Sequence, residues 1–298
     1  MKGLSIVIPV YEYNPTELIT VLHQQCSSLK IPFEIIVIDD FSSVEPYVRW
    51  KNQLDKKINL YIYRLEQNIG RAAIRNELIK KASFDWLLFL DADTLPCKNQ
   101  YIENYIPFLS STNTCVCGGT AYKKTAPDTE LLLRWKYGTA REEISAAQRN
   151  QYPFDTFTLN NLLIRKEVLL KFPLDNSIQK YGHEDTLLGM TLAENGLKII
   201  HINNFVYHEG LDTNEVFLQK VKQSIETLVD LYKQNKLPSK TKIIKLHNTL
   251  TAFKLNGLVA FCIKPFIPAI EKNLLGSDPS MFYMDLLKLW YFETVLNR

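Results

Sequence analysis

Strand-like and helix-like segments alternate along the first third of the chain, and this alternation constrains the fold more than any other feature. Continuous apolar runs rich in β-branched residues, as in strands buried on both faces, occupy residues 4–10, 33–40, 58–65 and 85–93. The segments between them have helical spacing or strong helix formers and cover residues 16–29, 44–54 and 70–82. The pattern predicts an α/β fold, with a mostly parallel central sheet flanked by helices.

Acidic and aromatic residues stand where three of these strands end. Tyr11 and Glu12 follow the first strand, Asp40 closes the second, and Asp91 and Asp93 close the fourth. Ligands of such sheets bind beyond the carboxyl ends of the strands, so this edge is the expected site. Two carboxylates one residue apart repel each other, and a divalent cation between them would remove that cost. Two solvated aspartates in a turn are the alternative interpretation.

The rest of the chain is less regular and then becomes helical. The expected later elements are a strand at 115–122, a helix at 130–149, a strand and helix in 157–172, a helix from Glu184, a strand before 202, and a last strand at 205–210. Helices dominate from residue 214 onward. We therefore expect one α/β domain at 1–210 and a helical C-terminal extension at 211–298.

Composition excludes several classes of protein. The net charge of +3 is too small to indicate nucleic-acid binding. Five scattered cysteines do not form a disulfide framework, so we expect reduced thiols and a cytoplasmic protein. We expect no leader and no membrane span. The nearest candidate for a span, LNGLVAFCIKPFIPAI at 255–270, is interrupted by Lys264, Pro265 and Pro268.

Six stretches resemble, in order, the inverting glycosyltransferases of family 2, which have the GT-A fold. These stretches are SIVIPVYEYN (5–14), EIIVIDDFS (34–42), NIGRAAIRN (68–76), WLLFLDADTLP (86–96), FTLNNLLIRKEVL (157–169) and GHEDTLLGMTLAENG (182–196). The resemblance covers roughly residues 4–210. Two departures are Glu12, where many relatives have Asn, and FTLNN, which lacks the paired glycines often found there.

The resemblance implies a nucleotide-sugar site at the predicted edge. Its residues would be Pro9, Tyr11, Glu12, Asp40, Arg71, Arg75, Asp91 and Asn160. Asp40 would hydrogen-bond a uracil-type base, and Tyr11 would stack on that base. Arg71 and Arg75 lie one helical turn apart and would reach the base or the phosphates. From the residues alone, the two arginines could equally form a solvated helix face, and Asp40 could cap a helix.

The resemblance also implies a divalent metal, Mn²⁺ or Mg²⁺, that bridges the diphosphate. Asp93 would be the main ligand, and Asp91 would contact the sugar, the ribose or the metal through water. His208, after the last strand, would be a further ligand, because imidazole suits Mn²⁺-type sites. A structural role is the alternative for His208.

The catalytic base is expected in the pair Glu184-Asp185. The acceptor hydroxyl must lose a proton as it attacks the sugar, and the resemblance assigns this role to Asp185 and acceptor binding to Glu184. Acids in the first turn of a helix are also favourable for purely structural reasons.

These observations predict an enzyme that moves a sugar from a nucleotide-diphosphate sugar, with UDP the preferred nucleotide, to an acceptor hydroxyl with inversion. A saccharide or lipid-linked saccharide acceptor in surface polysaccharide or glycoconjugate synthesis would fit. A non-catalytic nucleotide-sugar-binding protein is the alternative. A sugar-phosphate nucleotidyltransferase fits less well, because PVYEYNP replaces the glycine-rich loop that it needs.

The extension leaves two further questions open. Residues 211–298 hold 12 Lys and Arg against 8 Asp and Glu. Residues 217–236 have apolar residues at helical spacing with lysines on the other face, and residues 281–296 are rich in aromatic residues. Such a tail could lie on the cytoplasmic face of a membrane. We favour packing against the α/β domain or a second subunit, because apolar stripes on helices usually face a core. A homo-oligomer is therefore an open alternative.

Overall fold

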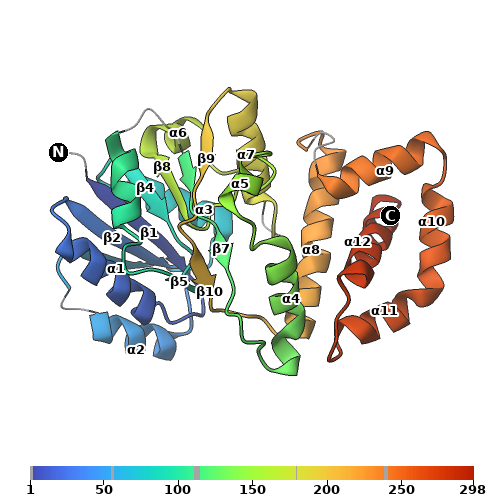
Figure 1. Cartoon of the computed structure of the whole chain (residues 1–298), viewed down its shortest axis with the longest axis horizontal. Coiled ribbons are helices and arrows are strands. Elements are labelled where there is room, and N and C mark those ends of the chain that lie inside the picture. Colours follow the sequence, from blue (N-terminus) through green and yellow to red (C-terminus); the bar gives the residue numbers. More distant parts are fainter. Residues whose placement is uncertain (1–2, 55–56, 111–114, 179, 238–240) are drawn as a thin grey trace. The chain divides into compact units, whose positions relative to one another are not determined.

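The chain forms two compact units, shown in a computed structural model that describes residues 3–54, 57–110, 115–178, 180–237 and 241–298 (Figure 1). The first unit comprises Met1–Tyr122, Glu143–Gln179 and Glu184–Gly210, and the second comprises Lys123–Glu142, Lys180–His183 and Leu211–Arg298. One boundary between the units falls between Gly210 and Leu211. Two internal segments, 123–142 and 180–183, belong to the second unit instead of the first.

A seven-stranded mixed sheet forms the centre of the first unit, in the order β3-β2-β1-β4-β8-β6-β9. Its strands are β1 (Leu4–Val10), β2 (Phe33–Asp39), β3 (Leu60–Arg64), β4 (Trp86–Phe89), β6 (Cys115–Cys117), β8 (Leu162–Arg165) and β9 (Ile199–His201). The first four strands are parallel, and β8 runs antiparallel to both of its neighbours. The carboxyl ends of β1, β2 and β4 therefore meet at one edge of the sheet.

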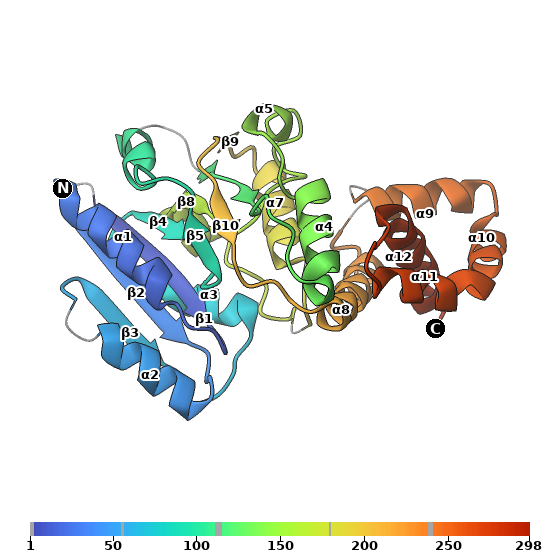
Figure 2. The ribbon, with the colours of Figure 1, turned by 60° about the horizontal axis from the view of Figure 1, so that its bottom comes forward.

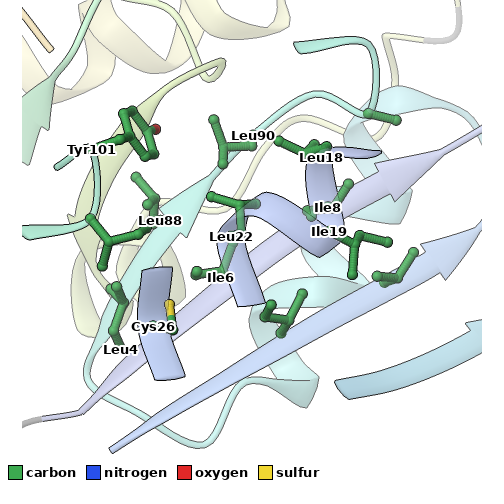
Figure 3. Close-up of a cluster of buried hydrophobic side chains, with 14 of the residues drawn as sticks. Leu4, Ile6, Ile8, Leu18, Ile19, Leu22, Cys26, Leu88, Leu90 and Tyr101 are labelled. Atoms are coloured by element: carbon green, nitrogen blue, oxygen red, sulfur yellow. The ribbon is translucent and has the colours of Figure 1, made fainter. Parts of the chain in front are cut away.

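Helices cover both faces of this sheet, as expected. They are α1 (Thr16–Ser28), α2 (Val44–Leu54), α3 (Arg71–Lys81), α5 (Ala146–Arg149), α6 (Lys166–Lys171), α7 (Glu184–Glu194) and the 3-10 helix η1 (Glu103–Ser110). Alternate residues of β1 face opposite cores: Ile6 packs with α1, and Val7 packs with α3. Figure 2 shows α1 lying along the sheet, and Figure 3 shows Ile6 and Ile8 against Leu22 of this helix. These packed layers hold the strand ends in place.

A second sheet of three short strands, in the order β5-β10-β7, lies in the same unit. Its strands are β5 (Thr94–Pro96), β7 (Thr120–Ala121) and β10 (Val206–His208). β10 pairs antiparallel with β5, so that His208 is opposite Thr94 and Val206 is opposite Pro96. This register brings the end of β10 beside the residues that follow β4.

Helices make up the second unit. They are the 3-10 helix η2 (Thr129–Leu131), α4 (Leu132–Arg141), α8 (Asn214–Lys233), α9 (Lys242–Ala252), α10 (Asn256–Ile263), the 3-10 helix η3 (Lys264–Phe266), α11 (Ile267–Leu274) and α12 (Met281–Leu296). Figure 1 shows α8 to α11 around α12. Apolar residues of α8 and α12, such as Phe217 and Leu287, lie in one core with Leu133 of α4. The apolar stripes of these helices thus share a core within the second unit, whereas the sequence favoured packing against the α/β domain or a second subunit.

Two expected elements are interrupted for local reasons. The strand predicted at 115–122 divides into β6 and β7 at Gly118, where a Cβ atom would lie 2.3 Å from the Tyr105 hydroxyl. The helix predicted at 130–149 ends at Arg141, and α5 begins separately after Ser145. The side chain of Ser145 accepts from the backbone N–H of Gln148 in a capping box.

Among the helices of the described residues, none is by itself long and apolar enough to cross a membrane. The helix Lys242–Ala252 and the segment Asn256–Leu274 meet the length and composition criterion only as a pair, with a bend of 116° between them.

Candidate active site

The predicted site residues come together at the carboxyl edge of the central sheet, within the first unit. Tyr11 follows β1, Asp40 follows β2 and Asp91 follows β4, while Arg75 and Asp185 come from the N-terminal halves of α3 and α7. Residues more than a hundred positions apart therefore converge, because the parallel strands end together.

Asp91 is bound to a buried arginine. Nη2 of Arg75, whose side chain is 4% exposed, donates to Oδ1 of Asp91 at 2.6 Å. Burial alone would raise the pKa of Asp91, but the guanidinium groups of Arg75 and Arg71 outweigh it and lower the pKa. Asp91 therefore stays ionised at the edge of the sheet.

Asp93 has a different partner. The pairing of β10 with β5 places Nδ1 of His208 3.7 Å from Oδ2 of Asp93. Burial raises the pKa of Asp93, and the charge of Asp91 raises it further, whereas His208 opposes the shift. Gly210 lies against this carboxylate: a Cβ atom there would be 2.6 Å from the Cβ of Asp93.

The donor set at Asp93 suits a hard divalent cation that shares its coordination with a ligand. No group of three or more His, Cys, Asp or Glu side chains in the described part of the chain could hold a metal by itself. Asp93 and His208 supply a carboxylate and an imidazole side by side, while Asp91 is engaged by Arg75. Mg²⁺-type sites commonly use one or two carboxylates and complete the shell with phosphate oxygens and water.

The acids Glu184 and Asp185 open α7 at the same edge. Oε1 of Glu184 lies 3.1 Å from Nε of Arg71 and 3.6 Å from Nη1 of Arg75. Arg75 thus contacts carboxylates of two elements, the end of β4 and the start of α7. Burial, and then the charge of Glu184, raise the pKa of Asp185 to about 7. A carboxyl group with such a pKa is suited to take up and release protons near neutral pH.

Asp40 holds the loop that leads into α3. Its two carboxylate oxygens accept from the backbone N–H groups of Ile69 at 2.8 Å and Gly70 at 3.1 Å. Burial raises the pKa of Asp40, and these hydrogen bonds partly offset that effect. The structure therefore places Asp40 at the N-terminus of α3, and the predicted contact with a base stays a prediction.

Glu12 and Tyr11 form the rim of the site after β1. Oε1 of Glu12 accepts from the backbone N–H and the hydroxyl of Ser43, both at 2.8 Å. Its φ of 48° is in the left-handed region, which asparagine tolerates better than glutamate. Tyr11 is 56% exposed, so its ring is available to a ligand, whereas Pro9 is part of β1 beside Ile38.

Asn160 positions the backbone of the acidic segment. Its side-chain oxygen accepts from the backbone N–H of Asp91 at 3.2 Å. Asn161 plays a different part. It is fully buried, with φ at 61°, and its Oδ1 accepts from the hydroxyls of Tyr101 and Tyr105 at 2.6 Å. Of the two asparagines, Asn160 is the one that contacts the predicted site.

Sequence reasoning missed three residues near this edge. Ser42 donates to Oδ1 of Asp39 at 2.5 Å and accepts from the backbone N–H of Glu12 at 2.8 Å, so it joins the ends of β1 and β2. Burial, and then the charges of Asp93 and Glu209, raise the pKa of Tyr13. Gly210 was visible only as the last letter of HEG, directly after a candidate ligand.

A cavity of about 600 Å³ lies entirely within the second unit. Its walls come mainly from α4, α8, α9 and α12. Two of its cations are already paired, Arg141 with Asp285 at 2.7 Å and Arg134 with Glu142 at 3.0 Å. None of the carboxylates at the sheet edge lines this cavity, so we assign the chemistry to the edge.

Sequence comparisons point to one family. A family model described as glycosyl transferase family 2 matches residues 5–171. An uncharacterized glycosyltransferase of Haemophilus influenzae is 24% identical over 267 residues, which are 88% of this chain and 98% of that protein. A chondroitin synthase of Pasteurella multocida is 25% identical over 225 residues, which are 65% of this chain but 23% of the synthase. The chain thus spans less than a quarter of the synthase.

A structural comparison agrees with the sequence match. The mannosyltransferase PcManGT of Pyrobaculum calidifontis, solved in complex with GDP-Man and Mn²⁺, has a TM-score of 0.54 and 15% identity, covering 99% of this chain and 84% of that one. At this identity the likeness shows the fold alone. The GT-A fold expected from the sequence is confirmed.

Proposed function

The chain belongs to glycosyl transferase family 2 and is a glycosyltransferase; on this premise we propose that it transfers a sugar from a nucleotide-diphosphate sugar to an acceptor hydroxyl, with inversion and with the help of a metal. The observation that carries this proposal is the arrangement of Asp93, His208 and Asp185 at one edge of the sheet, with a pKa of about 7 for Asp185. The edge combines donors for a cation with a carboxyl group suited to accept a proton.

Asp185 would act as the general base. The acceptor hydroxyl attacks the anomeric carbon while its proton passes to a carboxylate oxygen of Asp185, and the bond to the diphosphate breaks on the opposite face. A base is most effective when its pKa lies near the working pH, which fits a carboxyl group raised to about 7. Glu184, held by Arg71 at 3.1 Å, would orient the acceptor beside it.

Asp93 and His208 would hold the divalent cation, Mn²⁺ or Mg²⁺, and Asp91 would contact the sugar or the ribose. When bound, the cation would neutralise charge that develops on the diphosphate leaving group. The PcManGT complex contains Mn²⁺ with a nucleotide sugar, and this supports the same kind of site here. Arg71 and Arg75 would position the carboxylates that they contact, and they would also bind the phosphates of the donor.

The donor base would lie between Tyr11 and the loop held by Asp40. We propose uridine, because the resemblance assigns Asp40 to a uracil-type base. GDP and dTDP sugars are the competing donors, and GDP-Man is the ligand of PcManGT. Similarity to chondroitin synthase supports a saccharide acceptor in polysaccharide or glycoconjugate synthesis.

A thermal-shift panel of UDP, GDP and dTDP, each with and without Mn²⁺, tests the donor and the metal together. We expect one nucleotide to raise the melting temperature, and only with Mn²⁺. A nucleotide present at a hundred times its Kd would stabilise the folded protein by about 2.7 kcal/mol. Asp93→Asn should abolish the part of the melting-temperature shift that depends on Mn²⁺. Asp85→Asn, an exposed aspartate of the same unit, is the matched control and should retain it. If no nucleotide changed the melting temperature, the result would indicate that the protein does not bind a nucleotide-sugar donor.

A further inference from the structure

The segment around α10 exposes an unusual run of large apolar side chains. Phe253 is 70% exposed, Leu258 58%, Phe261 74% and Phe266 64%. Ile263 is the buried residue of α10. Single exposed apolar residues are ordinary, but several large ones within one short segment, from Phe253 to Phe266, indicate an interaction surface.

Charge narrows the choice of partner. The chain carries seven lysines and no aspartate or glutamate between residues 231 and 270. Lys254 and Lys264 flank α10 and are exposed, and Lys242 and Lys245 are exposed on α9. A partner that meets this surface must accept apolar rings and cations together, which favours an anionic one.

We propose that this surface docks the protein on an anionic lipid bilayer. We call it the α10 face, and it consists of Phe253, Lys254, Leu258, Phe261, Lys264 and Phe266. The rings and Leu258 would enter the boundary between headgroups and acyl chains, and the lysines would contact anionic headgroups. The proposal concerns a partner of the molecule and does not depend on the proposed reaction.

The geometry favours a segment that lies in the bilayer surface and does not cross it. A crossing helix needs about 20 consecutive apolar residues, whereas α10 has 8 residues and is followed by η3 with Lys264 and Pro265. The chain also bends by 116° between α9 and the α10–α11 segment. Figure 1 shows α9, α10 and α11 running around α12, and the buried residue of α10, Ile263, lies in one core with Leu287 of α12.

A second copy of the chain fits the α10 face less well. In a two-fold contact the same patch meets itself, so Lys254 and Lys264, the charged residues of the α10 face, would meet no carboxylate of this face across the interface. The absence of acids between residues 231 and 270 leaves no carboxylate within that stretch to balance them. Anionic headgroups would supply that balancing charge.

Co-sedimentation with vesicles of phosphatidylcholine, with and without phosphatidylglycerol, tests the proposal on the full chain. We expect binding to the anionic vesicles. Leu258→Ser combined with Phe261→Ser should weaken it at least about tenfold. Leu170→Ser on α6 removes a leucine that is also 58% exposed, and it should leave binding unchanged. Lys254→Gln and Lys264→Gln should each weaken binding about fivefold, and only on anionic vesicles.

Two results would overturn the proposal: no binding of the wild type to anionic vesicles, or equal binding of the wild type and the Leu258→Ser/Phe261→Ser variant. If the wild type does not bind anionic vesicles but forms a dimer that this variant loses, a second copy covers the α10 face instead. A nucleotide thermal shift, measured in parallel, separates failure of this proposal from failure of the proposed transferase reaction.

Discussion

At the scale of single residues, the site treats two neighbouring aspartates in opposite ways. Asp91 is bound to Arg75 at 2.6 Å, and its pKa is lowered, whereas burial raises the pKa of Asp93 beside His208. The repulsion between the two carboxylates is thus offset on one side by a permanent cation. On the other side, a bound cation would complete the compensation, as the sequence motif indicates.

The raised pKa of Asp185 predicts how the rate depends on pH. Below about 7 the carboxyl group is protonated and cannot accept the proton of the acceptor, so the rate falls about tenfold for each pH unit. Above that value the group is ionised, and the rate levels off. A rate profile from about pH 5 to 8 checks this, with melting temperatures recorded at each pH as the control. A rate that does not change with pH over this range would show that the protonation of Asp185 does not control the reaction.

The acids at this edge could be predicted from sequence because they directly follow recognisable strands. The partner of Asp93 could not be derived from spacing alone: His208 is more than a hundred residues away and reaches it through the pairing of β10 with β5. Glu12 likewise showed no sign of its bond to Ser43, because that contact depends on the loop that follows β2.

At the scale of elements, Arg75 connects α3 to the end of β4 and to the start of α7. Its spacing from Arg71 predicted a shared helix face, but burial of Arg75 to 3% exposure was not predictable. The alternation of helices and strands identified α3, and the acids after Gly182 identified the start of α7, because both helices are long and clearly bounded. Breaks such as Gly118 depend on close tertiary contact with Tyr105, which local pattern does not contain.

Arg75→Met should destabilise the protein by about 3 kcal/mol or more, because it leaves Asp91 and Glu184 without their buried cation. Arg49→Met is the matched control. It removes an ion pair with Glu45 in which both side chains are exposed, and it should cost less than about 0.5 kcal/mol. Urea unfolding of the two variants measures the difference. Equal midpoints would mean that Arg75 does not stabilise this junction.

At the scale of the whole molecule, the chain divides into two units with separate cores. The change from alternating elements to continuous helices is the reason to expect a boundary after residue 210. The sequence did not show that α4 belongs to the second unit, because an apolar stripe identifies a buried face without identifying its partner. Here Leu133 of α4 packs in one core with Phe217 and Leu218 of α8.

Separate cores predict that the second unit can be weakened alone. Glu293 is 1% exposed, and its Oε1 lies 2.7 Å from Nδ1 of the buried His247. Glu293→Ala should destabilise the second unit by about 3 kcal/mol. Hydrogen exchange should then rise in α8 to α12 but not in β1 and β2. Glu215→Ala, an exposed residue of α8, is the control, and an equal rise in both units would contradict independent cores.

The central claim is that this chain is a sugar transferase whose base is Asp185, and Asp185→Asn tests it most directly. We would measure UDP release from a panel of UDP sugars with Mn²⁺, together with nucleotide binding. The account predicts a loss of about a hundredfold or more in turnover, with nucleotide binding kept and Asp155→Asn, an exposed aspartate, unaffected. Turnover of Asp185→Asn at the wild-type rate would contradict it.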